Sequence, residues 1–262
     1  MSNQSKEPHE REVFGIKILK PSHPQLRQLK KRHKPSFQGY KMWNSTWLLL
    51  DYLGRQGLPP ASRLLDAGCG WGPASICSAR RHGAQVTAID IDPEVFPFLN
   101  LHAAINQVEI RTLEAGFEQI SSPLLQLQDV LAGADICFEE QLVAPLYSLI
   151  EKALEAGVQQ IVIADPGRRP FKKLCAECSR KLGALMRDWE TPEPLIDWPG
   201  TVPLIRGHLL IIGNSCPPGH KGIQRLKSSP PHQNPLSPPH LPSPCSAQTP
   251  FLRAIPPFTV CS

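Results

Sequence analysis

The chain has 262 residues, enough for one large domain or two small ones with a sizeable hydrophobic core. It contains 28 Lys and Arg residues and 23 Asp and Glu residues, which gives a net charge of +5. Residues 214–262 contain no acidic residue and carry +4 of that charge. Residues 1–213 are therefore close to neutral, which excludes a strongly basic nucleic-acid-binding domain and makes a nucleic-acid partner unexpected.

The sequence also argues against export and membrane insertion. No run approaches the ~18 consecutive apolar residues of a membrane span, and the polar start of the chain is not typical of a signal peptide. The eight cysteines are then expected to be free thiols in a reducing compartment. We therefore expect a cytoplasmic protein with no membrane partner. Its oligomeric state stays open, with a monomer favoured.

Residues 1–38 are interpreted as an N-terminal extension. A basic run from Leu29 to Lys34 could contact nucleic acid or an acidic protein, although a solvated face is the simpler interpretation. A helix is predicted over residues 41–52, because apolar side chains recur there with an amphipathic spacing. These side chains are Trp43, Trp47, Leu48 and Leu50, of which Trp47 and Leu48 are expected in the core.

From residue 63 onward, short apolar runs alternate with helical segments. Strands are predicted at residues 63–65, 85–89, 108–110, 134–138 and 160–164, with a last strand at 207–212. Helices are predicted near residues 73–82, 94–106, 142–156 and 170–185. This alternation is typical of an α/β fold, in which helices cover both faces of a parallel sheet. The folded domain is expected to span residues 39–213.

The last segment, residues 214–262, contains twelve of the 29 prolines and few apolar residues. Such a composition cannot build a core, so we predict a disordered tail. The abrupt loss of acidic residues leaves a second hypothesis open, namely translation in another frame after a lost stop codon. A proline-rich docking tail is a third, but no repeated PxxP signature supports it.

A glycine-rich stretch joins a predicted strand to a predicted helix. It runs from Asp66 through Gly68, Gly70 and Gly72, with Pro73 at the position where a dinucleotide fingerprint needs its third glycine. The Gly-Lys-Ser/Thr of a P-loop is absent from it. Asp90 ends the next predicted strand, where a carboxylate can accept both hydroxyls of a ribose. Asp66 can receive an ammonium group or backbone N–H groups.

The set D-x-G-x-G-x-G, followed by an acid eighteen residues after Gly72, resembles motif I of the class I S-adenosylmethionine-dependent methyltransferases. The alternative is that this glycine-rich stretch is only a structural turn in another kind of α/β enzyme. The resemblance implies that S-adenosylmethionine is the cofactor and that the sheet is Rossmann-like, seven-stranded and mostly parallel. It also implies roles for individual residues: the three glycines would shape the pocket, Asp66 would face the methionyl amine, Asp90 would take the ribose, and Phe117 and Glu118 would approach the adenine.

Three further segments resemble the seven-strand protein-lysine methyltransferases, including the electron transfer flavoprotein beta subunit lysine methyltransferase and its bacterial relatives. They are Gly39 to Ser45, Asp135 to Phe138, and Asp165-Pro166-Gly167-Arg168. The resemblance implies a protein substrate, closure of the pocket by Trp43 and Ser45, and rim carboxylates that orient the amine and share its proton. Asp135 is the first candidate for that work, followed by Glu139 and Glu140. Phe138 replaces the tyrosine of the family's D-x-x-Y motif, which puts the lysine substrate in question.

Simpler interpretations remain for several residues. Asp92, followed by Pro93, fits a helix N-cap, and Glu139 and Glu140 fit a solvated turn. Cys175-x-x-Cys178 has no second pair to complete a zinc site, so a structural role is favoured and no metal is expected. Arg168 is expected to hold its loop or to meet an acidic substrate.

Three functional hypotheses follow from the sequence. The first is methylation of a protein side chain, with lysine favoured. The second is methylation of a small molecule or nucleic acid. The third is a fold that binds the cofactor without turnover.

Overall fold

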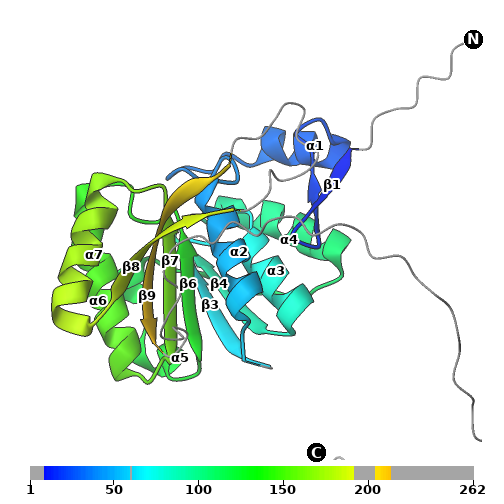
Figure 1. Cartoon of the computed structure of the whole chain (residues 1–262). Helices are drawn as coiled ribbons and strands as arrows, with labels where there is room; N and C mark the ends of the chain where they lie inside the picture. The colour runs from blue at the N-terminus through cyan, green and yellow to red at the C-terminus, as the bar shows by residue number, and fades with distance from the viewer. Residues whose placement is uncertain (1–8, 60, 192–203, 214–262) are drawn as a thin grey trace, which may run out of the picture. The chain divides into compact units, whose positions relative to one another are not determined.

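The computed structural model describes residues 9–59, 61–191 and 204–213, and the predicted tail lies outside them. Its centre is a seven-stranded sheet with helices on both faces (Figure 1). The strands of this sheet are β3 (Arg63–Ala67), β4 (Gln85–Asp90), β5 (Arg111–Glu114), β6 (Val130–Ala134), β7 (Gln160–Asp165), β8 (Leu185–Glu190) and β9 (Arg206–Gly213). The helices that follow the N-terminal segment are α2 (Ser45–Gln56), α3 (Pro73–His82), α4 (Phe96–Asn106), α5 (Ser122–Leu125), α6 (Val143–Glu155) and α7 (Arg169–Leu182).

The strand order is β5-β4-β3-β6-β7-β9-β8. Only β9 runs antiparallel to its neighbours, so the expected Rossmann-like, mostly parallel sheet is confirmed. From β3 the chain winds outward to β4 and β5, and it then crosses back to β6 on the other side of β3. This reversal places a topological switch point between β3 and β6, where open α/β sheets bind ligands at the carboxyl ends of their strands.

Alternating apolar side chains explain why both faces of the sheet are covered. In β7, Val162 joins the core on one face, whereas Ile161 and Ile163 join the core on the other. β9 divides its four apolar residues between the two cores in the same way. Because successive side chains of a strand point to opposite faces, an unbroken apolar run requires helices on both sides. The helices α2 and α3 cover one face, and α6 and α7 cover the other.

The N-terminal segment folds onto the domain. It forms a hairpin of β1 (Glu10–Val13) and β2 (Ile16–Leu19), followed by α1 (Pro24–Arg32). The side chain of Asn106 in α4 extends the free edge of β2, since it accepts a hydrogen bond from the N–H of Lys17 and donates one to its carbonyl, each 2.8 Å long. Leu26 of α1 is fully buried in a small core with Trp71 and Phe98. Figure 1 shows α1 at the top, on the side where the parallel strands end.

Two predicted strands were misplaced. The strand expected at residues 134–138 is β6, which ends at Ala134, and the one expected at 108–110 is β5, which begins at Arg111. β6 reads Val-Leu-Ala-Gly-Ala, which has weak strand propensity, whereas Ile136 and Cys137 are buried although they lie in a loop. β5 is an edge strand in which no residue is fully buried, so its sequence lacks an apolar run.

Other elements were missed or shifted. Strand β8, whose residues are mostly exposed at the other edge of the sheet, was not predicted from the sequence. Nor were β1, β2 and α1. The helix expected over residues 41–52 begins at Ser45. The expected core positions of Trp47 and Leu48 are confirmed, with exposed fractions of 5 % and 0 %. In the described ranges no helix is both long and apolar enough to cross a membrane.

Candidate functional site

Four parallel strands end in residues of the candidate site. Gly68 follows β3, Asp90 ends β4, Asp135 follows β6 and Asp165 ends β7. Because the carboxyl ends of parallel strands lie along one edge, residues more than ninety positions apart in the sequence are brought together there. The site therefore extends across the switch point, with the glycine loop on one side and the β7 loop on the other.

The glycine loop, residues 68–72, has a backbone that only glycine adopts without strain. Gly70 has a φ of 54° and Gly72 a φ of 75°, both in the left-handed region. A Cβ at Gly72 would lie 2.5 Å from Cγ of the buried Leu99, so α3 could not approach α4 with a larger residue there. A Cβ at Gly70 would meet no atom within 4 Å. The space beside Gly70 is therefore open to a ligand.

Asp90 points toward the glycine loop. Its Oδ2 accepts a hydrogen bond of 2.9 Å from the N–H of Gly70, and its Oδ1 accepts one of 3.0 Å from the N–H of Asp92. Burial raises the pKa of Asp90 above its usual value, although these backbone N–H groups lower it. A carboxylate offers about four lone-pair positions, so two remain for hydroxyl groups of a ligand. The sequence predicted this orientation, and the contact with a ribose stays a prediction.

Asp66 is enclosed at the end of β3. It is 2 % exposed, and its Oδ2 accepts a 2.6 Å hydrogen bond from the hydroxyl of Ser75 in the first part of α3. Burial raises the pKa of Asp66 to about 7, although the hydrogen bond from Ser75 lowers this pKa. In this structure Asp66 ties β3 to α3. Its predicted contact with a methionyl amine stays untested.

The loop after β6 touches the glycine loop through Ile136. A Cβ added to Gly68 would lie only 2.5 Å from Cγ2 of Ile136, so the Ile136 side chain packs directly against the backbone of Gly68. The preceding residue, Asp135, has a φ of 61°, which is unusual outside glycine. Its backbone N–H donates to the carbonyl of Ala164 in β7 (2.9 Å). The strained turn thus sets Asp135 beside both the glycine loop and the end of β7.

Arg168 joins two buried carboxylates. Its Nη1 lies 2.7 Å from Oδ1 of Asp135 and 2.8 Å from Oδ2 of Asp165. Asp165 is fully buried and also accepts hydrogen bonds of 2.7 Å from the N–H groups of Gly167 and Arg168. Burial disfavours the charge of Arg168, but the two carboxylates raise its pKa overall. The expectation that Arg168 holds its loop is confirmed.

A cavity of about 310 Å³ opens beside this ion-pair cluster. Its lining residues are Gln38, Trp43, Asp135, Phe138, Glu139 and Arg168. We refer to it as the Arg168 cavity. The other oxygen of Asp135, Oδ2, accepts a 3.1 Å hydrogen bond from the N–H of Ser45, the first residue of α2. Of the two residues predicted to close the cofactor pocket, Trp43 lines this cavity, whereas Ser45 is buried and contacts it only through Asp135.

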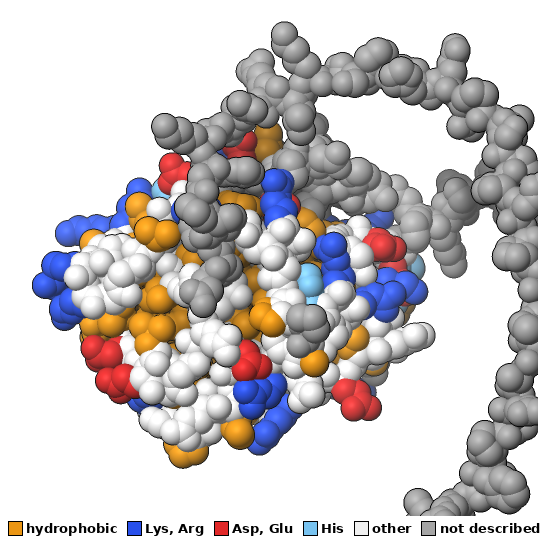
Figure 2. Space-filling model, turned by 60° about the horizontal axis from the view of Figure 1, so that its bottom comes forward, with side chains coloured by type: hydrophobic (Ala, Val, Ile, Leu, Met, Phe, Trp, Pro, Cys, Tyr) orange, Lys and Arg blue, Asp and Glu red, His pale blue; other side chains and the backbone are white. Residues whose placement is uncertain are grey.

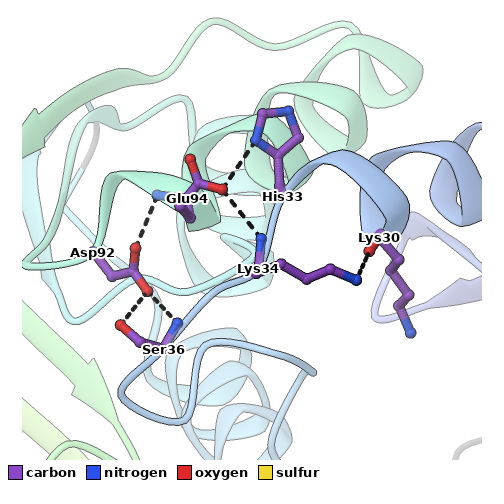
Figure 3. Close-up of polar contacts among 6 residues, drawn as sticks. All are labelled: Lys30, His33, Lys34, Ser36, Asp92 and Glu94. Carbon is purple, nitrogen blue, oxygen red and sulfur yellow. Dashed lines mark hydrogen bonds and ion pairs between the residues drawn. The ribbon is translucent and has the colours of Figure 1, made fainter.

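The chain between α1 and α2, residues 33–44, passes over the carboxyl ends of the strands. We call this segment the strap. Two acids after β4 hold it, as Figure 3 shows: Asp92 accepts from the N–H and the hydroxyl of Ser36, and Glu94 accepts from the N–H of Lys34 (3.1 Å) and lies 3.3 Å from Nδ1 of His33. Asp92 also caps η1 (Pro93–Val95) through the N–H of Glu94 (3.0 Å), as expected.

The remaining predicted residues lie farther from these contacts. Glu140 is exposed and paired with Lys173 of α7, which lowers the pKa of Glu140. Phe117 and Glu118 lie in η2 (Phe117–Gln119) after β5, where Phe117 packs against the core and Glu118 is exposed. Neither position establishes an adenine contact. An apolar side chain that the sequence analysis missed, Ile91, is 53 % exposed directly after Asp90.

The cysteine pair of α7 lies in the core. Cys175 and Cys178 are buried, and burial raises the pKa of each thiol to about 12. Both are free, as are Cys69, Cys77 and Cys137. Among the residues that the structure describes, no group of three His, Cys, Asp or Glu side chains is arranged to hold a metal ion.

Comparison with known proteins finds similarity in the part of the chain that contains the glycine-loop half of this site. Residues 64–157 match the family described as "Methyltransferase domain". The chain is similar to ubiquinone biosynthesis O-methyltransferase of Xanthomonas campestris, with 44 % identity over 61 residues, 23 % of this chain and 25 % of the relative. It is also similar to ribosomal protein L11 methyltransferase of Bordetella parapertussis, with 35 % identity over 100 residues, 34 % of this chain and 32 % of the relative.

Among solved structures, the plantazolicin methyltransferase BpumL in complex with SAH aligns with a TM-score of 0.46 and 15 % identity, covering 74 % of this chain and 91 % of that one. A methyltransferase from Geobacter sulfurreducens, in complex with S-adenosyl-L-homocysteine, aligns with a TM-score of 0.44 and 19 % identity, covering 63 % and 74 %. The chain spans only about a quarter to a third of the length of the curated relatives. The sequence similarity to methyltransferases therefore lies in residues 64–157, which include the glycine loop and Asp90.

Proposed function

We propose that this chain is an S-adenosylmethionine-dependent methyltransferase that methylates a lysine side chain of a protein. The observation that carries the proposal is the Arg168 cavity. It lies at the ends of β6 and β7, and it combines aromatic with acidic side chains. Ile136, which follows the lining residue Asp135, packs against Gly68 of the glycine loop. A donor held at the glycine loop and an acceptor held in this cavity would meet at the switch point.

The glycine loop fits the cofactor. The open space beside Gly70 admits a ligand against the backbone, and Asp90 keeps lone pairs for the two hydroxyls of a ribose. Ile91 is placed to cover an adenine ring, because its exposed side chain follows Asp90 directly. When bound, S-adenosylmethionine supplies a methyl group on a positively charged sulfur. The chain's own work is to orient this group and the acceptor, and to free a lone pair on the acceptor.

The cavity suits a cation. Its charged lining residues are two acids, Asp135 and Glu139, against one base, Arg168, and the base is already paired with Asp165 behind it. Trp43 and Phe138 add aromatic rings, whose faces attract ammonium groups. A lysine side chain has the matching charge and a long apolar stem.

Within this cavity Glu139 and Asp135 have different tasks. Asp135 is held by Arg168 and by the N–H of Ser45, so it is fixed in position and can orient the amine. Among the described residues, the side chain of Glu139 contacts only that of Gln141, which donates a hydrogen bond of 2.6 Å. Glu139 therefore accepts the proton that the lysine ammonium must lose, which leaves a lone pair on the nitrogen for methyl transfer. Glu140, turned toward Lys173, takes no part.

One observation favours a second candidate, methylation of a small molecule. Phe138 stands where the lysine methyltransferases carry a tyrosine, and the Xanthomonas relative is by its name an O-methyltransferase of ubiquinone biosynthesis. The Bordetella relative is by its name a methyltransferase of a ribosomal protein, which agrees with the protein substrate. A protein partner, a cytoplasmic location and a domain bounded at residues 39 and 213 belong to the proposal.

A methyl-transfer assay on a whole lysate tests the proposal. The full chain and radiolabelled S-adenosylmethionine are added, and the lysate is separated into protein, RNA and metabolite fractions. We expect label in protein, recovered as methyl-lysine after hydrolysis. The Asp90→Ala variant should transfer much less, and Glu139→Gln should slow transfer without weakening cofactor binding. Label confined to the metabolite fraction would replace the lysine assignment with the second candidate.

A further inference from the structure

Charge is unevenly distributed between the N-terminal layer and the rest of the domain. Residues 14–50 contain eight Lys and Arg residues and no Asp or Glu, although residues 1–213 together carry only +1. Figure 2 shows the molecule with the bottom of Figure 1 brought forward, and both acidic and basic side chains are visible around that face. The eight cations of residues 14–50 all belong to β2, α1 and the segments that follow them, up to Lys41 in the strap.

Three of these cations lie on the exposed surface of α1. Arg27, Lys31 and Arg32 of α1 are exposed, and none of them forms an ion pair within the part of the chain that the structure describes. Arg27 and Lys31 are one helical turn apart and share a face of α1. The opposite face holds the buried Leu26. This arrangement leaves a basic surface that faces solvent.

The strap connects that basic surface to the Arg168 cavity. It begins at His33 next to α1, and its residues Gln38 and Trp43 line the cavity. Between the basic surface and the cavity, the strap presents two exposed aromatic side chains, Phe37 at 68 % and Tyr40 at 51 % exposure. Lys41 lies 3.9 Å from the centroid of the Trp43 ring, so the strap carries a further cation next to its aromatic side chains.

The exposure of Phe37 is maintained against a backbone cost. Phe37 and Gln38 have φ values of 41° and 70°, in the left-handed region that bulky residues rarely adopt. Such strain persists only where surrounding contacts enforce it. Here the contacts are those of Asp92 and Glu94 with the strap (Figure 3), and of Trp71, whose Nε1 donates to the carbonyl of Gly39 (2.8 Å). The strap is therefore fixed before any partner binds.

We propose that the basic face of α1 and the strap form a docking surface for a polypeptide whose methylated lysine is flanked by acidic residues. The proposal rests on the function proposed above. The cavity carries a net negative charge and the docking surface a positive one, so a ligand that meets both must offer a cation and anions close together. A polypeptide with a lysine among Asp and Glu residues does so, whereas a nucleic acid has no cation for the cavity. Phe37 would contact an apolar side chain of the same segment.

Binding without turnover tests this surface. Two fluorescein-labelled peptides of equal length present one lysine, flanked by Asp and Glu in the first and by Asn and Gln in the second. Anisotropy is measured with the full chain saturated with S-adenosyl-L-homocysteine. We expect the acidic peptide to bind about tenfold more tightly, the combined effect of several exposed ion pairs, and added salt to reduce the preference.

The location is tested by charge reversal. Combined Arg27→Glu, Lys31→Glu and Arg32→Glu substitutions should abolish the preference for the acidic peptide. A matched variant, Arg111→Glu with Arg180→Glu, changes two exposed cations outside the layer and should keep it. Thermal unfolding of both variants shows whether they fold, and the salt dependence of the unmodified chain gives a second readout. Equal affinity for the two peptides, or a preference that survives the α1 substitutions, would overturn the proposal.

An oligouridine probe provides the remaining comparison. Binding of oligouridine that is tighter than that of the acidic peptide and is lost in the α1 variant would assign the surface to nucleic acid and overturn the proposal. Methyl transfer to the two peptides is measured separately. If the acidic peptide binds more tightly but its lysine is not methylated, the proposed function is refuted and the docking surface stands. If both peptides are methylated equally, the docking surface is refuted and the proposed function stands.

Discussion

The two halves of the site are held by different interactions. At the ends of β3 and β4, backbone conformation and backbone hydrogen bonds set the geometry, as in the contact from Gly70 N–H to Asp90. At the ends of β6 and β7, ion pairs between side chains do so, with Arg168 between Asp135 and Asp165. A backbone-defined half suits a cofactor of fixed shape. A half built from charged side chains can be altered residue by residue to suit a different acceptor.

The largest effect is expected from a glycine substitution in the backbone-defined half. Gly72→Ala puts a Cβ 2.5 Å from Leu99 at a positive φ, so we expect the free energy of unfolding to fall by about 3 kcal/mol. Gly70→Ala has a similar φ but free space, and should cost only about 1 kcal/mol. Urea denaturation measures both. Equal losses would show that packing against α4 is not what requires Gly72.

The next effect concerns the buried acid beneath the glycine loop. Because burial raises the pKa of Asp66 from its usual 3.8 to about 7, the folded state holds this proton more tightly than the unfolded chain. Stability should therefore fall as the pH rises from about 4 to about 7, and then level off. Asp66→Asn removes this loss of stability. The free energy of unfolding of the variant should therefore be a few kcal/mol higher than that of the unmodified chain at pH 8, and equal to it near pH 4. A variant that is destabilised equally at both pH values would contradict this.

A smaller loss is expected in the half built from ion pairs. Asp165→Asn keeps the shape of a fully buried side chain but removes one of the two charges that hold Arg168. We expect about 2 kcal/mol of destabilisation in urea, less than for a fully buried pair because Arg168 is partly exposed. Glu140→Gln, which breaks an exposed pair with Lys173, should give no measurable change. Equal losses of stability in the two variants would contradict the expected difference between the buried and the exposed ion pair.

The smallest effect on stability is expected in the strap, where it tests what the strap contributes. Ser36→Ala removes the hydroxyl that donates to Asp92 (2.9 Å) and leaves the backbone contact in place. A loss of about 0.5–1 kcal/mol in unfolding free energy is expected, with unchanged cofactor affinity. Ser179→Ala, an exposed serine of α7, provides the matched control and should have no effect. A change in cofactor affinity in Ser36→Ala alone would mean that the strap belongs to the cofactor half.

The sequence predicted the backbone-defined half better than the other, for a physical reason. Gly68 to Gly72 and Asp90 act through local backbone conformation and through the end of an adjacent strand, so their spacing carries the information. The Arg168 cavity combines Gln38 and Trp43 with residues about a hundred positions later. No spacing within one segment indicates that Asp135 is already engaged by Arg168. That engagement makes Glu139 the better candidate for accepting a proton.

The same distinction applies to the fold. Strands β3, β4 and β7 were predicted at their places because their buried runs are continuous. β6 was not, because its Gly133 packs closely under Ile136 and the apolar run lies in the loop that follows. Asp92 was predicted only as a helix cap, since its contact with Ser36 joins residues 56 positions apart.

Calorimetric titration of the full chain with S-adenosyl-L-homocysteine tests the central claim most directly. Asp90→Ala removes the carboxylate beside Gly70, and Asp129→Ala is the control, because its ion pair with Arg63 lies at the other end of the sheet. The account predicts binding by the unmodified chain and by Asp129→Ala, and affinity weakened roughly tenfold to a hundredfold in Asp90→Ala. Equal affinity in Asp90→Ala, or no binding by the unmodified chain, would contradict it.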